Sequence, residues 1–178
     1  NYVEGQYLYS FSGSNYNSTF LNNVPLTYYY HATRNQNTLW SVRSDRTNAS
    51  TYIDVFDLTT VPPNRLFGNS ILIPNAPQSI RGIFYAGPNK LYVVNVSTNR
   101  VEEWDITNNN AVIVTTVFNI PTPYAPLSIA YNNCNLYVNL SNNVFYITIN
   151  NGFNNYGVVA FDINGNVLNS GTPPSNFA

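Results

Sequence analysis

Charged side chains are scarce in this 178-residue chain, at 8% of residues against about 25% in typical soluble domains. Its one lysine and six arginines are spread along the sequence, and the net charge is −1. Nucleic-acid binding needs clustered basic side chains that neutralise phosphates. The densest group is Arg34, Arg43 and Arg46, with Asp45 among them, and we expect it to lie in a solvated loop. The charge pattern therefore argues against a nucleic-acid partner.

Sulfur and imidazole are almost missing as well. There is no methionine, and Cys134 is the one cysteine, so an intrachain disulfide is excluded. Because Asn1 opens the chain, we expect either that a leader has been removed or that the chain is a piece of a longer protein. His31 is the sole histidine. Without a Gly-x-Ser-x-Gly elbow or a Cys/His cluster, the sequence favours no catalytic triad, thiol nucleophile, metal site or cofactor.

No apolar run approaches the roughly 20 residues needed to cross a bilayer, so membrane insertion is not predicted. Disorder is not predicted either, because disordered chains lack aromatic residues and this one has 15 tyrosines and 10 phenylalanines. Its polar surface must therefore be neutral, and asparagine alone supplies 32 residues. This composition resembles that of cell-surface and virion proteins of acidophilic archaea, because amides and hydroxyls stay solvated where carboxylates lose their charge.

An internal repeat organises the chain. Residues 73–107 and 120–163 share Ile-Pro, Ala-Pro-x-Ser-Ile, Asn-(x)-Leu-Tyr-Val and aromatic-Asp-Ile in the same order. A looser copy stands in the first half, where residues 37–40 match the Asn-Leu-Tyr element and residues 56–59 match the aromatic-Asp-Ile element. The unit is about 45–55 residues long, which suits a four-stranded propeller blade.

Segments rich in Val, Ile, Tyr and Phe predict the strands of these units. The predicted strands are 52–56, 91–96, 111–118, 136–140, 144–149 and 158–163. Asn164-Gly165 predicts a hairpin in which both turn residues have positive φ, and Asn151-Gly152 marks a second turn. No segment has helical periodicity with caps. The fold class is therefore predicted to be all-β.

The repeat resembles the NHL and YVTN-type β-propeller repeats, with LYVVNVSTNRVEEWDI as its best match. The resemblance implies one repeat domain over residues 1–178, with units at 20–72, 73–119 and 120–171 and an outer strand within 1–12. Propellers usually need four to eight blades to close a ring. With about three blades, we expect an incomplete ring or one that partner chains complete. A β-sandwich is the alternative fold.

The acidic residues are expected to serve the fold. Asp57, Asp105 and Asp162 follow an aromatic residue in the repeat, and we expect them to accept N–H bonds in turns. Glu102 and Glu103 point to opposite faces of their strand. A catalytic pair of carboxylates would have to be assembled from distant residues, so the chain is predicted not to be an enzyme.

Candidate sites for modification and binding come from two residue patterns. Asn-x-Ser/Thr triplets make Asn17, Asn48, Asn95 and Asn139 candidates for glycosylation, although a chain so rich in these residues contains several such triplets by chance. Asn17 and Asn48 are favoured because they lie in polar loops. Tyrosine offers a large contact area and a hydroxyl group, and the candidates for a binding platform are Tyr7, Tyr9, Tyr28, Tyr29 and Tyr30.

The pattern as a whole indicates a non-enzymatic, extracellular or surface-displayed module that binds or assembles. It would be part of a cell-surface structure, a filament or a virion, and its partners would be other protein chains, as a homo- or hetero-oligomer, or glycans. Two alternatives remain open. One is a lectin-like propeller that binds carbohydrate, and the other is a propeller hydrolase with a carboxylate site in its central channel.

Overall fold

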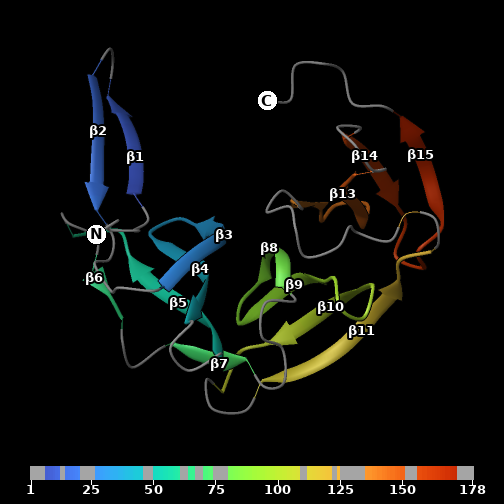
Figure 1. Cartoon of the computed structure of the whole chain (residues 1–178), viewed down its shortest axis with the longest axis horizontal. Helices are drawn as coiled ribbons and strands as arrows, with labels where there is room; N and C mark the ends of the chain where they lie inside the picture. The colour runs from blue at the N-terminus through green and yellow to red at the C-terminus, as the bar shows by residue number, and fades with distance from the viewer. Residues whose placement is uncertain are drawn as a thin grey trace. The chain divides into compact units, whose positions relative to one another are not determined.

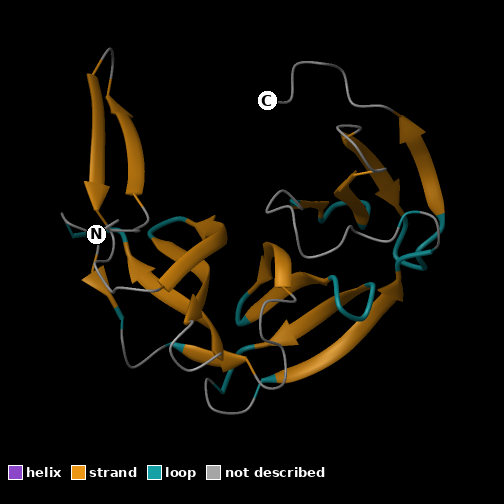
Figure 2. Ribbon diagram, viewed as in Figure 1, coloured by secondary structure: helices purple, strands orange, loops and turns teal. Residues whose placement is uncertain are grey.

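The computed structural model describes residues 7–12, 15–20, 27–45, 50–60, 64–66, 70–73, 80–108, 112–121, 124, 135–150 and 156–171. Up to residue 30, and at residues 44, 45, 50, 149, 150, 156 and 169–171, this description covers the backbone and not the side chains. The described part of the chain consists of strands joined by turns and contains no helix (Figure 2). The prediction of an all-β fold is confirmed.

Two compact units make up the chain, Asn1–Pro77 and Gln78–Ala178. The single repeat domain over 1–178 stays a prediction. In the first unit, β1 (Tyr7–Ser12) pairs with β2 (Asn15–Phe20) in a two-stranded hairpin (Figure 1). The segment expected to supply an outer strand thus pairs locally in the structure.

A five-stranded antiparallel sheet follows the hairpin. Its strands are β3 (Thr27–Asn35), β4 (Thr38–Asp45), β5 (Ser50–Asp57), β6 (Asn64–Arg65) and β7 (Ile71–Ile73). The order is β3-β4-β5, and the short strands β6 and β7 both pair with the far side of β5. The sheet is therefore a meander whose last position is filled by two separate pieces of chain.

The second unit contains two four-stranded antiparallel meanders. The strands of the first are β8 (Ile80–Gly87), β9 (Lys90–Asn95), β10 (Arg100–Asp105) and β11 (Ile113–Asn119). Those of the second are β12 (Leu136–Asn139), β13 (Val144–Asn150), β14 (Tyr156–Phe161) and β15 (Val167–Gly171). In both sheets each strand pairs with the strand next to it in the sequence. All six predicted strands are confirmed, within β5, β9, β11, β12, β13 and β14 or overlapping them.

Turns recur at matching places in these two sheets. The side-chain oxygens of Asn95 and Asn139 each accept a hydrogen bond from the N–H two residues later, at 3.1 Å in both cases. Asn99 and Asn143 then close the turns with φ of 52° and 53°, a conformation that asparagine tolerates better than most residues. The hairpins β9–β10 and β12–β13 are thus built by the same local chemistry.

The predicted geometry of the Asn164-Gly165 turn was wrong in one respect. Of the two residues, Gly165 alone has a positive φ, of 82°. Asp162 and Asn166 close the hairpin, because the N–H of Asp162 bonds to the carbonyl oxygen of Asn166 at 3.0 Å. The loop therefore has three residues, 163–165, instead of two, and a left-handed glycine in its last position is common in such loops. The Asn151-Gly152 turn lies outside the described residues.

The predicted match of Asp162 with Asp57 and Asp105 is also wrong by one strand. Asp57 and Asp105 end the strands that pair with the Leu-aromatic strands β4 and β9. The Leu-Tyr-Val strand β12 pairs with β13, and Thr148 occupies the matching place. Asp162 follows β14, the next strand along. The aromatic-Asp-Ile similarity therefore matched β14 with β10, one strand too late.

One apolar core joins the two sheets of the second unit. From the first sheet and its C-terminal extension it takes Val94, Val96, Val101, Phe118 and Ile120, and from the second Leu136, Val138, Phe145, Ile147, Val159 and Phe161. The sheets lie close together at Gly82, where a Cβ atom would lie 2.8 Å from Cβ of Leu136. Real Cβ contacts are not that short, so glycine is required there for β8 to lie against β12.

The matched Leu-Tyr-Val segments turn opposite faces toward this shared core. On β9 the tyrosine of the motif, Tyr92, faces the core together with Val94. On β12 the leucine and valine of the motif, Leu136 and Val138, face it instead. Side chains alternate between the faces of a strand, so Tyr137, the counterpart of Tyr92, lies on the face of the second sheet that points away from the core. The two sheets are therefore stacked front to back.

Candidate functional site

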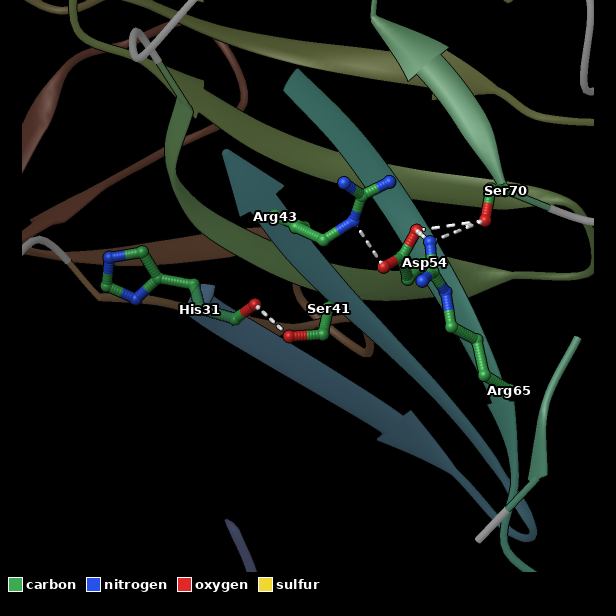
Figure 3. A network of polar contacts seen from close by, with 6 residues as sticks. All are labelled: His31, Ser41, Arg43, Asp54, Arg65 and Ser70. Carbon is green, nitrogen blue, oxygen red and sulfur yellow. Dashed lines mark hydrogen bonds and ion pairs between the residues drawn. The ribbon is translucent and has the colours of Figure 1, made fainter. Parts of the chain in front are cut away.

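A buried ionic cluster lies on the first sheet (Figure 3). Asp54 of β5 is fully buried. One of its carboxylate oxygens accepts a hydrogen bond from Nε of Arg43 at 2.7 Å, and the other accepts one from Nη2 of Arg65 at 2.8 Å. The hydroxyl of Ser70 donates to the same carboxylate at 2.9 Å. The Arg43 guanidinium also lies over the ring of Tyr52, 4.3 Å from its centroid. The expectation that Arg43 belongs to a solvated loop was wrong, because Arg43 lies on β4 and is buried in an ion pair with Asp54.

His31 and Ser41 lie beside this cluster but do not form a catalytic relay with it. His31 sits in a β-bulge of β3 and is buried. The Ser41 hydroxyl donates to the main-chain carbonyl oxygen of His31 at 3.2 Å, and Figure 3 shows the imidazole pointing away from Asp54. A Ser-His-Asp triad requires the carboxylate to orient the imidazole, and both oxygens of Asp54 already bind arginines.

Two neighbouring glutamates on β10 have separate structural partners. Glu102 is buried and accepts hydrogen bonds from the indole N–H of Trp104 at 2.9 Å and the side-chain amide of Asn95 at 3.1 Å. Glu103, on the other face, pairs with Lys90 at 2.7 Å. The prediction that the two side chains point in opposite directions is confirmed. Among the acidic side chains that the structure describes, none lies opposite Glu102 or Glu103 as the second carboxylate of an acid–base pair.

Aspartates hold the turns that follow three of the strands. The carboxylates of Asp57 and Asp105 accept the backbone N–H of Thr59 at 2.8 Å and of Thr107 at 2.9 Å. Asp162 accepts the N–H groups of Asn164 and Asn166 at 2.8 Å each. The prediction that these residues accept turn N–H bonds is confirmed.

These hydrogen bonds lower the pKa of Asp57, Asp105 and Asp162 below the ordinary value of 3.8. The largest effect comes from the side chains of Thr59, Thr107 and Asn166 respectively, and the backbone N–H bonds add to it. A carboxyl whose pKa is lower in the folded state stabilises the fold above its unfolded pKa. That contribution is lost as the pH falls through the folded pKa.

We therefore expect the stability of the protein to fall as the pH is lowered from about 5 to about 2. A variant with Asp57, Asp105 and Asp162 all changed to asparagine keeps an acceptor oxygen in each turn but loses the titration, so its stability changes less over this range. Urea unfolding midpoints measured at a series of pH values check the prediction. Equal pH dependence in the two proteins would contradict it.

An aromatic row runs from Phe84 of β8, which packs against the shared core, to two tyrosines on the outward face of the sheet β12–β15. The rings of Phe84 and Tyr137 meet edge to face with centroids 5.5 Å apart, and those of Tyr137 and Tyr146 are 5.9 Å apart. Tyr137 is 59% exposed and Tyr146 36%. No charged residue occurs in β12, β13, β14 or β15. We call this row, Phe84, Tyr137 and Tyr146, the tyrosine face.

The sequence pointed to other tyrosines as the binding platform. Tyr7 and Tyr9 lie on β1, and Tyr28, Tyr29 and Tyr30 lie on β3. Their side chains are outside the described part of the structure, so the platform stays a prediction. The tyrosine face was missed, although Tyr137 stands between two aliphatic residues of a predicted strand, a pattern that places its ring opposite theirs.

The four glycosylation candidates have different surroundings. Asn17 lies within β2 instead of a polar loop, and Asn48 is outside the described residues, as is Cys134. Asn95 is buried, with its amide bonded to Glu102. Asn139 is half-buried at the end of β12, where its side-chain oxygen accepts two hydrogen bonds from Ser141. Glycosylation of these residues stays a prediction.

Neither metal-binding clusters nor membrane-spanning helices occur in the described residues. No group of three or more His, Cys, Asp or Glu side chains gathers there as a metal site, and no helix of that part is long and apolar enough to cross a bilayer. Comparison with protein-family models and with curated proteins found no match. The side chains described above therefore carry the functional argument.

Proposed function

We propose that this protein is a non-enzymatic binding and assembly module built from propeller-type blades. Its place is extracellular or on a surface, in a cell-surface structure, a filament or a virion. The blade assignment is supported by the meander order of the sheets and, within the second unit, by the front-to-back stacking of its two sheets, in which one face of a sheet covers the opposite face of the next. NHL and YVTN-type repeats share this organisation.

The proposal rests on the difference in exposure between Tyr137 and Tyr92. Tyr92 packs against Phe145 of the neighbouring sheet, with ring centroids 5.1 Å apart, and burial is the main cause of its raised pKa. Tyr137 occupies the matching position on the last sheet, yet 59% of it is exposed. In the described part of the chain, the face that the repeat uses to contact its neighbour is therefore exposed at Tyr137.

The acidic side chains support a binding role over catalysis. Of the eight acidic residues, Glu4 and Asp45 have side chains outside the described part. The other six each bond to arginine, lysine, indole, amide or turn N–H groups. General acid–base catalysis needs a carboxyl that can reach the substrate, and these serve the fold.

Affinity at the tyrosine face would come from aromatic contact area, because this sheet offers no charge for a partner to pair with. Tyrosine is enriched in protein interfaces, since it combines a large ring with a hydroxyl. Exposed aromatic rings also stack against sugars, and the exposure of Tyr137 therefore supports glycan binding as the second candidate function.

We expect the double change Tyr137→Ser and Tyr146→Ser to weaken association about tenfold or more, because exposed aromatic anchors dominate interface energies. Sedimentation velocity over a range of protein concentrations measures self-association, and titration with a panel of oligosaccharides measures sugar binding. The matched control is Leu72→Ser, which removes an exposed apolar side chain (52%) from β7 in the first unit.

The two candidate functions give different results in this experiment. Assembly through the tyrosine face predicts self-association that the double variant weakens and the Leu72→Ser variant keeps at the parent's strength. Saturable sugar binding by a monomer, abolished in the double variant, would replace assembly by the lectin-like function. If the double variant matched the parent in both measurements, the tyrosine face would have no role and the proposal would fail.

A further inference from the structure

Strand β11 is an outer strand with an unusual combination of properties. Within the described part of the chain it pairs only with β10, so one of its edges has no strand beside it. Its sequence, IVTTVFN, is rich in β-branched residues and has no charge, proline or glycine. Ile113 is 66% exposed and Val114 45%, and Thr115 and Thr116 are exposed as well.

Natural sheets usually protect such edges from association, with charged residues, prolines, bulges or very short strands. The edges formed by the last strands of the other two large sheets show such protection. In the first sheet the outer position is split between two residues of β6 and three of β7. In the last sheet β15 has five residues, a register shift and a terminal glycine. The ladder of β11 is continuous from Ile113 to Thr116 and shifts only beyond it.

We propose that β11 pairs edge to edge with β11 of a second copy of this chain, in antiparallel orientation. The inference rests on the proposed assembly function and names its partner. The free edge of a strand offers backbone N–H and C=O groups that another strand satisfies best. Because β11 carries no charge, self-pairing brings no like charges together, and its exposed β-branched side chains favour a β-strand as the neighbour.

Symmetry restricts the register of this pairing. A two-fold axis that relates two antiparallel strands of one sheet runs perpendicular to the sheet and keeps side chains on their own face. If the axis passes between the two strands at the level of Thr115, each Thr115 lies opposite its own copy. Val114 of each strand then lies opposite Thr116 of the other. Opposed threonines are among the favourable cross-strand pairs. The two four-stranded sheets would then form one continuous eight-stranded sheet.

Charges introduced on β11 test the pairing directly. In a Val114→Lys, Thr116→Lys variant, each new lysine faces another across the strand junction, so we expect dimer affinity to fall about 100-fold or more. The Val114→Glu, Thr116→Glu variant should fail to dimerise in the same way. Mixing the two variants should restore a one-to-one dimer, because opposite charges then face each other. Sedimentation equilibrium measures all three, and circular dichroism checks that each variant is folded.

Two further measurements make the test specific. The control Asn142→Lys places one lysine in the exposed turn between β12 and β13 and should leave dimerisation unchanged. Hydrogen exchange of the β11 amides should slow as protein concentration rises, and the turn after β12 should show no such change. If the lysine and glutamate variants failed to dimerise because their folds were destabilised, mixing them would not restore a dimer. Restoration therefore shows that the charges act across the strand junction.

The outcomes separate this inference from the proposed function. If the lysine variant dimerises like the parent while the Tyr137→Ser, Tyr146→Ser variant does not, β11 pairing is overturned and assembly through the tyrosine face stands. If the chain stays monomeric at all concentrations but binds sugar, pairing is overturned and the lectin-like candidate survives. If it neither associates nor binds sugar, both fail.

Discussion

Replacing Asp54 by alanine is expected to lower the free energy of unfolding by about 3–5 kcal/mol, the range seen when one partner of a buried ion pair is removed. The carboxylate is fully buried and bonds to the guanidinium groups of Arg43 and Arg65, whose side chains are 8% and 10% exposed. Without it, two positive charges remain beside each other with little access to water. The loss of stability comes more from leaving these buried charges without the carboxylate than from the lost attraction itself.

Asp57→Ala is the matched control for this experiment. It removes a carboxylate from the same strand, three residues on, but its side chain accepts hydrogen bonds only in an exposed turn. We expect a clearly smaller loss of stability there. Urea unfolding at neutral pH, followed by tryptophan fluorescence, measures both variants, since Trp40 lies on β4 of the same sheet. Equal destabilisation by the two changes would show that the Asp54 cluster contributes nothing special.

Phe145→Ala should also cost about 3–5 kcal/mol, as truncation of a fully buried phenylalanine usually does. The ring is completely buried and lies between Tyr92 and Phe118 of the neighbouring sheet, with centroid distances of 5.1 and 5.3 Å. Alanine would leave a cavity at the centre of the core that joins the two sheets. The loss should therefore loosen the contact between the sheets as well as the strand itself.

Tyr146→Ala provides the comparison for Phe145→Ala, because it removes the next ring along β13 from the opposite, solvent-exposed face. We expect it to cost about 1 kcal/mol or less, as surface substitutions commonly do. Urea unfolding gives the two free energies, and hydrogen exchange of the β9 amides shows whether the sheets separate. If both variants lost the same stability, the core would not lie where Phe145 places it.

The sequence was sufficient to predict the all-β class and six of the strands, because both depend on local patterns. β-branched and aromatic runs broken by Asn-rich turns locate the strands, and the repeated Leu-Tyr-Val motif locates corresponding hairpins. Where the alignment failed, at Asp162, the cause was also local. Phe161-Asp162-Ile163 matches Trp104-Asp105-Ile106 in residue type, and only the pairing of β12 with β13 shows that it lies one strand later.

The sites depended on information that the sequence does not contain. Arg43 and Asp54 are brought together by the register of β4 and β5, which sets Ser41 opposite Asp54 and Arg43 opposite Tyr52. Tyr92 and Tyr137 occur in identical Leu-Tyr-Val contexts, so no pattern distinguishes the covered ring from the exposed one. What separates them is that Phe145 of the neighbouring sheet packs against Tyr92, whereas Tyr137 is largely exposed.

The absence of charge from strands β12 to β15 has a consequence for kinetics. Opposite charges on two partners steer their diffusional encounter and can raise association rate constants by orders of magnitude over those of neutral surfaces. A sheet with no charged residue gains nothing from such steering. Complexes formed through it would assemble at the slow, unsteered rate whatever the ionic strength, and their persistence would be set by how slowly the partners separate.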